Sequence, residues 1–387
     1  MQAHIDITGL GLVSPLGSDS WATIAALLKG RTIADRLKDV PDQMDPTTLA
    51  MAVGGAGRAR FAAGDPAVDL AERAAREALF EAGLDRPETP VRTIIASSKG
   101  AVLSMLEHTL THTAAGRVPH HEAAAFGPHA WLADQLTDRL PLGMTTSIVA
   151  ACATSMTALN QARREILEGR EDRVLVVAVE AAMHPVFVET YRRLGVLAPT
   201  DPPAEYVARP LDQGRSGFTL NEIAAAVLLE RHDPDRTPDA RLVDVRIGTQ
   251  TTDLVRPADD QAVLRGLLQS MAIQNADLTA IHPHAPGTSA DEAEIRAIAS
   301  VAGESETPLY AVKGALGHAL GASGLVSVVV AARAGRAGRI PPMPWLHQPL
   351  STPLSIRPGG VEIGPGLHLA VSAGFGGHVG AALLDVR

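Results

Sequence analysis

The chain has 387 residues, of which 46% are hydrophobic, and carries a net charge of −9 at pH 7. This length allows a large buried core, and the acidic excess argues against nucleic acid as a general partner. A single cysteine excludes an internal disulfide framework. The sequence shows neither a signal peptide nor the ~18 consecutive apolar residues of a membrane span. We therefore expect a cytoplasmic protein without a membrane partner.

Hydrophobic periodicity divides the chain into alternating strands and helices. Apolar or alternating runs predict strands over 5–13, 91–97, 145–150, 174–179, 224–230, 241–247, 309–312, 367–372 and 379–386. Apolar residues at helical spacing predict helices over 21–30, 69–83, 154–167, 261–271 and 291–302. Segment 105–132 gives mixed signals. Because the strand over 174–179 is apolar on both faces, we expect an α/β protein whose sheet is covered by helices.

The lone cysteine, Cys152, lies between the predicted strand over 145–150 and the predicted helix over 154–167. A residue at such a junction is near the first free backbone N–H groups of the helix, which stabilise a thiolate and lower the pKa of the thiol. This pattern favours a nucleophile. A small buried hydrophobe fits the same local pattern equally well, so the junction alone leaves both interpretations open.

Two further stretches favour the nucleophile. One is Ile281-His282-Pro283-His284-Ala285-Pro286-Gly287-Thr288, and the other is Val312-Lys313-Gly314-Ala315-Leu316-Gly317-His318-Ala319-Leu320-Gly321-Ala322-Ser323-Gly324. Together with Cys152, they resemble the three active-site motifs of the β-ketoacyl synthases of the thiolase fold. The resemblance extends nearly from end to end of the chain.

This resemblance implies a fold and a division of the chain. The family has α/β/α/β/α layers with two mixed five-stranded sheets, built from two similar halves. We therefore expect an N-terminal half over 1–235 that carries Cys152, and a C-terminal half over 236–387 that carries both histidine motifs.

The resemblance also implies a decarboxylative Claisen condensation of a cysteine-bound acyl group with a malonyl group on an acyl carrier protein. Cys152 takes the acyl group, because a thiolate attacks a thioester at neutral pH. His284 and His318 match the two histidines whose neutral imidazoles donate to the enolate. Lys313 matches a lysine that tunes the site electrostatically. No cofactor is expected, since the carrier protein supplies the phosphopantetheine arm.

Other matches concern the oxyanion, the pantetheine arm and the carrier protein. Phe375 is expected to supply the second oxyanion N–H and to gate the acyl pocket, within a mobile glycine-rich loop that also contains Gly374, Gly376 and Gly377. Thr288 matches a pantetheine-binding threonine, and Arg209 resembles an arginine that docks the carrier protein. Asp291 and Glu294 match an acidic pair that holds the loop and takes no part in catalysis.

Several positions depart from the family pattern, which leaves the natural substrate and the retention of condensation open. Pro286 stands where the family commonly has a threonine, and Ala373 where it has a phenylalanine. Ser327 replaces a glutamate, and His378 with Val379 replaces a threonine-asparagine pair. Glycines are usual where this chain has Asn221 and Ile223.

Two alternatives follow from these departures. One is an acyltransferase of the same fold that loads Cys152 but passes the acyl group to another acceptor. The other is a non-catalytic chain-length subunit paired with an active synthase, although such partners usually lack the cysteine. We expect a homodimer, or a heterodimer with a second ketosynthase-like chain. A degradative thiolase is disfavoured, because it uses a second cysteine.

A metal site is not predicted. His108 and His112 are four residues apart, so both could lie on one face of a helix. No glutamate follows His108 as in the zinc-protease pattern, and no third ligand is evident in the sequence.

Overall fold

The computed structural model describes residues 4–39, 64–199, 208–249, 261–273, 277–303 and 305–387. Its main feature is a nine-stranded mixed sheet in the order β3-β2-β4-β5-β1-β6-β11-β10-β7. The strands are β1 (Ile5–Val13), β2 (Val91–Ala96), β3 (Leu142–Ile148), β4 (Arg173–Glu180), β5 (Ile223–Arg231), β6 (Ala240–Thr249), β7 (Leu278–His282), β10 (Gly366–Ala373) and β11 (His378–Val386). A small separate ladder pairs β8 (Arg339–Ile340) with β9 (Val361–Glu362).

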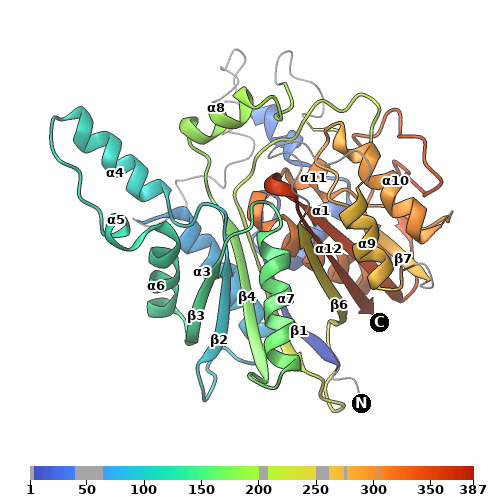
Figure 1. Ribbon diagram of the computed structural model, residues 1–387, viewed down its shortest axis with the longest axis horizontal. Coiled ribbons are helices and arrows are strands. Elements are labelled where there is room, and N and C mark those ends of the chain that lie inside the picture. Colours follow the sequence, from blue (N-terminus) through green and yellow to red (C-terminus); the bar gives the residue numbers. More distant parts are fainter. Residues whose placement is uncertain (1–3, 40–63, 200–207, 250–260, 274–276, 304) are drawn as a thin grey trace.

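Helices cover this sheet in layers (Figure 1). They are α1 (Ser20–Leu28), α3 (Pro66–Glu81), α4 (Leu103–Ala114), α5 (Glu122–Phe126), α6 (Pro128–Arg139), α7 (Thr154–Leu167), α8 (Pro185–Arg193), α9 (Ala262–Ser270), α10 (Ala290–Ala302), α11 (Val312–Leu316) and α12 (Ser323–Arg336), with short 3₁₀ turns at Ile33–Asp39, Leu320–Ala322 and Phe375–Gly377. None of the helices in the described ranges has the length and apolar character needed to cross a membrane.

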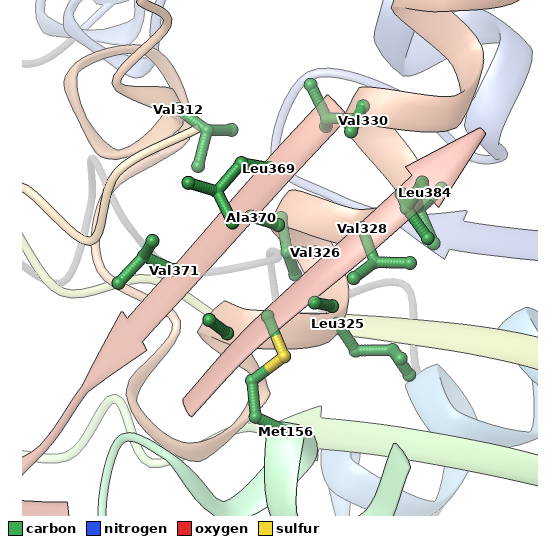
Figure 2. Packing of buried hydrophobic residues seen from close by; sticks show 14 of the residues in the cluster. Met156, Val312, Leu325, Val326, Val328, Val330, Leu369, Ala370, Val371 and Leu384 are labelled. Carbon is green, nitrogen blue, oxygen red and sulfur yellow. The ribbon is translucent and has the colours of Figure 1, made fainter. Parts of the chain in front are cut away.

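The central layer consists of α7 and α12, which pack against each other and against strands of both halves of the sheet. Residues 323–334 of α12 are all buried, as expected for a helix that is apolar on every side. Figure 2 shows Val326 of α12 next to Ala370 of β10 and Val328 of α12 towards Leu384 of β11, with Met156 of α7 below them. On the outer faces, α3 and α6 cover the first half, whereas α9 contacts β6 and β11 and packs on α10. The layers are therefore α/β/α/β/α, as predicted.

The strand arrangement differs from the predicted two five-stranded sheets, because the two halves join into one sheet and the second half contributes four strands. β1 and β6 pair over three residues, Ile5 to Ile7 against Ala240 to Leu242, so that five strands of the first half and four of the second form one sheet. The prediction of a strand over 309–312 is wrong: Leu309 makes an isolated parallel bridge to Ile281, and α11 begins at Val312. The predicted division between residues 235 and 236 falls in the connection between β5 and β6.

Candidate active site

Cys152 lies in a tight turn between β3 and α7, as its sequence context predicted. Ala151 has a φ of 46°, the left-handed conformation that makes the chain turn sharply before the helix. Thr154 fastens this turn, because its hydroxyl donates to the Ala151 carbonyl at 2.6 Å and accepts from the Ala150 N–H at 2.7 Å. The cysteine is only 7% exposed. Its position is fixed before the first turn of α7.

The expectation of a lowered thiol pKa is wrong for this arrangement. Burial raises the pKa of Cys152 to about 11, because it removes water from the charged form. The positive charge of Lys313 and a hydrogen bond from the Phe375 N–H act in the opposite direction and are outweighed. The protein therefore holds a thiol when no substrate is present.

The glycine-rich loop between β10 and β11 closes over the Cys152 turn. A Cβ on Gly374 would lie 2.7 Å from the Cys152 backbone nitrogen, so a side chain there has no room. Gly376 and Gly377 have φ values of 77° and 74°, which favour glycine. Phe375 packs on the apolar cluster that contains Cys152. This close approach lets the Phe375 N–H donate to the Cys152 sulfur, and the expected role of the two backbone N–H groups at an oxyanion stays a prediction.

His318 follows α11 in a buried loop, and its hydrogen bonds fix its tautomer. The Leu320 backbone N–H donates to Nδ1 at 2.9 Å, and the Ser323 hydroxyl lies 3.0 Å from the same nitrogen. Because Nδ1 accepts, the ring proton is on Nε2. Burial, with the nearby Lys313 charge, holds the pKa of His318 well below its usual value, so the imidazole is a neutral N–H donor.

His284 follows β7 and lies beside His318, with ring centroids 5.4 Å apart and planes at 76°. Burial, Lys313 and His318 hold the pKa of His284 well below its usual value. Glu294 of α10 holds this loop, since it accepts from the backbone N–H groups of His284 and Ala285 at 2.6 and 2.8 Å. Both imidazoles are thus uncharged near pH 7, as predicted from the chemistry.

Lys313 is buried in the first turn of α11, and its ammonium donates to the His284 carbonyl. Burial lowers its pKa, while Glu294 and the Cys152 sulfur act to raise it. Asp291, whose pKa burial raises to about 6, accepts from the N–H groups of Gly287 and Thr288. Lys313 therefore links the loop of His284 electrostatically to Cys152, and the acidic pair holds the loop as expected.

Thr288 and Arg209, the predicted pantetheine-binding and docking residues, make contacts within their own loops. The Thr288 hydroxyl accepts from the Ala290 N–H at 3.3 Å in the turn that opens α10. Arg209 is partly buried, and its guanidinium lies beside Asp212, whose pKa it helps to lower. The backbone N–H groups of His347 and Gln348 also donate to Asp212. Arg209 thus has a structural contact, and its role in docking stays a prediction.

Two of the departures from the family pattern have visible consequences. Asn221 donates from its amide to the Leu316 carbonyl at 2.6 Å, which ties the entry of β5 to α11. Ser327, where the family has a glutamate, is buried on α12, and its hydroxyl finds no hydrogen-bond partner within the described ranges.

Sequence reasoning missed Glu180, at the end of β4. This buried carboxylate accepts from the Ser98 N–H and from the Gly321 N–H at 3.2 Å, so it ties the loop after β2 to the loop after His318. Burial raises its pKa to about 7, and its charge raises the pKa of Cys152. A lone carboxylate directly after the apolar run over 174–179 was the available signal.

A buried thiol at a strand-to-helix turn, two neutral imidazoles and a converging glycine loop are the parts of a thiolase-fold condensing enzyme. Residues 2–234 match the family described as "Beta-ketoacyl synthase, N-terminal domain", and residues 245–347 match "Beta-ketoacyl synthase, C-terminal domain". The chain belongs to the β-ketoacyl synthase family, which confirms both the recognised family and its fold.

Individual relatives agree with this assignment. The chain is 27% identical to "3-oxoacyl-[acyl-carrier-protein] synthase 2" of Rhizobium meliloti (strain 1021), over 98% of each chain. It is similar in fold to "AntDE:AntF (apo): type II PKS acyl-carrier protein in complex with its ketosynthase bound to the hexaketide", with TM-score 0.84, 20% identity and full coverage of both chains. It is also similar to "The ishigamide ketosynthase/chain length factor", with TM-score 0.79, 22% identity and the same coverage. The family matches and these relatives together identify the chain as a β-ketoacyl synthase in type.

Proposed function

We propose that this chain is catalytically active and condenses an acyl group on Cys152 with a malonyl group on an acyl carrier protein. The observation that carries the proposal is the tautomer of His318, whose Nδ1 accepts a backbone N–H and whose Nε2 therefore donates. A neutral donor beside a second neutral imidazole suits an enolate oxygen.

The reaction has two stages. The Cys152 sulfur attacks the carrier-bound thioester; a new C–S bond forms, the old one breaks, and the carrier thiol takes the proton. The N–H groups of Cys152 and Phe375 stabilise the negative oxygen of the intermediate. In the second stage malonyl thioester loses carbon dioxide, and the electron pair passes into an enolate whose oxygen accepts from His284 and His318. The enolate carbon then attacks the acyl group and releases the Cys152 thiolate.

The carrier protein and a second synthase-like chain are the proposed partners. The carrier's phosphopantetheine arm enters beside Thr288, Arg209 contributes to docking, and no resident cofactor is needed. The dimer forms at β3, the outer strand of the sheet, where Met144 in the strand and Val149 directly after it are 66% and 56% exposed. An edge strand with exposed apolar side chains is suited to pairing with another chain. A cytoplasmic location is part of the same proposal.

The chain-length subunit is the second candidate, because one similar structure is a ketosynthase/chain length factor. Cys152, with its fastened turn and both histidines, favours the catalytic interpretation. A transferase that loads Cys152 without condensation shares the first stage only.

Mass spectrometry of wild type and Cys152→Ala separates these candidates. After incubation with acyl-carrier protein and then malonyl-carrier protein, we expect acylation at Cys152, followed by loss of carbon dioxide and a product two carbons longer. Acylation that malonyl-carrier protein cannot discharge would identify the transferase. A folded wild-type protein that accepts no acyl donor would contradict the catalytic proposal and favour the partner subunit.

A further inference from the structure

A group of histidines lies on α4 and the segment after it, a part of the chain that the proposed reaction does not use. α4 projects beside the β3 edge of the molecule (Figure 1). His108 and His112 are one helical turn apart on α4, with rings stacked at 3.9 Å between centroids. Two more histidines, His120 and His121, follow before α5.

The end of α4 turns the chain back toward these rings. Gly116 has a φ of 66°, its N–H donates to the Thr113 carbonyl at 3.0 Å, and the Arg117 N–H donates to the His112 carbonyl at 2.8 Å. This pair of bonds is a Schellman motif, which reverses the chain at a helix end. His120 is therefore carried back to α4, where its backbone N–H donates a long hydrogen bond of 3.4 Å to His108 Nε2, a bond that Nε2 would give up to bind an ion.

The three imidazoles of His108, His112 and His120 come close enough to share one ion. Each offers a ring nitrogen, and these nitrogens all lie within 4.8 Å of one another. Nitrogens of a tetrahedral zinc site are about 3.4 Å apart, because each Zn–N bond is about 2.1 Å. All three side chains are partly or fully exposed, so ring rotation can supply the difference.

The hydrogen bond of His112 prepares it as a ligand. Its Nδ1 lies 3.0 Å from the His108 carbonyl oxygen, which can only accept, so Nδ1 carries the proton and Nε2 carries the free lone pair. Metal-binding histidines are commonly oriented by such a bond from the other ring nitrogen to a backbone carbonyl. Three imidazoles without a thiolate suit zinc and its neighbours among the divalent transition metals.

We propose that His108, His112 and His120 bind one divalent transition-metal ion, with the fourth position open to solvent. The ion would fasten the segment after α4 to the helix. The sequence shows only the pair four residues apart, whereas the fold supplies the third ligand.

The test uses the full-length, tag-free protein after removal of metal with a chelator. Titration with Zn²⁺ against a chromophoric chelator should give one ion per chain, and Co²⁺ should give the visible absorption of a tetrahedral nitrogen site. His112→Gln and His120→Gln should each weaken zinc binding at least tenfold. His120 lies outside α4, so a loss of binding in His120→Gln does not come from unfolding of that helix, and circular dichroism checks the fold of both variants.

Two controls make the test decisive. His347→Gln, at an exposed histidine on another part of the chain, should bind as wild type does. Cys152→Ala should also bind as wild type. Absence of one tight site, equal binding by His112→Gln, or a similar loss in the His347 variant would overturn the proposal. So would a cobalt-thiolate band that disappears with Cys152.

Discussion

Replacing His368 with leucine should make the protein less sensitive to acid. His368 on β10 and His282 on β7 are fully buried, and their rings stack at 5.6 Å between centroids. His282 Nε2 and His368 Nδ1 are 3.3 Å apart. Burial lowers the pKa of His368 to about 4, and burial with the neighbouring imidazole lowers that of His282 well below its usual value. Both are neutral in the folded protein.

The sign and size follow from these values. Between pH 6.5 and about 4, the unfolded chain binds a proton at His368 that the folded protein does not bind, so folding stability falls as the pH falls. A difference of about 2.5 pH units, at ~1.36 kcal/mol each, amounts to roughly 3 kcal/mol near pH 4. At pH 7.5 the leucine variant should instead be less stable than wild type by about 1–3 kcal/mol, because it removes a buried polar partner of His282.

Urea unfolding from pH 7.5 to 4 measures this change. The stability difference between wild type and His368→Leu should move by about 3 kcal/mol in favour of the variant as the pH falls. Val371→Ala, at a buried and non-titrating position of the same strand, should lower stability by the same amount at every pH. A pH-independent difference for His368→Leu would refute the argument that the buried neutral imidazole causes the acid sensitivity.

Three further predictions concern the site and its support. Gly374→Ala places a Cβ 2.7 Å from the Cys152 backbone nitrogen and should slow acylation of Cys152 by about 10²–10³-fold in a folded protein. The control variant Gly359→Ala has open space around its Cβ and should leave the acylation rate unchanged. Glu180→Gln removes a charge that raises the pKa of Cys152, so the pH profile of thiol alkylation by iodoacetamide should shift to lower pH; an unshifted profile would contradict this coupling. Arg333→Ala leaves Glu81 and Asp239 without their buried partner and should lower the free energy of unfolding in urea by about 3–5 kcal/mol. A decrease below about 1 kcal/mol would show that water replaces the guanidinium.

The sequence was most informative where local pattern and tertiary packing agree. The predicted helix over 154–167 has the observed bounds of α7, because its apolar residues at helical spacing also face the central layer. The run over 309–312 is buried as its composition suggests, yet it forms one bridge and then a helix. Short apolar runs carry no period that separates a strand from a helix.

The electrostatics of the site could not be predicted in the same way. The expected lowering of the Cys152 pKa rested on a neighbouring helix, which is a local feature. The burial that outweighs it comes from segments far away in the chain, such as those of Phe218 and Leu320, together with the loop of Gly374 and Phe375. Glu180 was missed for the same reason, since its partners, Ser98 and Gly321, are far from it in sequence.

Burial gives Cys152 and the two histidines opposite but compatible properties. It keeps His284 and His318 neutral, which is the protonation state that the proposed donation of an N–H to an enolate requires. It also raises the pKa of the Cys152 thiol, which protects the sulfur from chance reaction while no acyl donor is bound. The Phe375 N–H lowers that pKa and belongs to the loop that closes over Cys152, so in the proposed reaction this one loop would stabilise both a thiolate and the oxyanion.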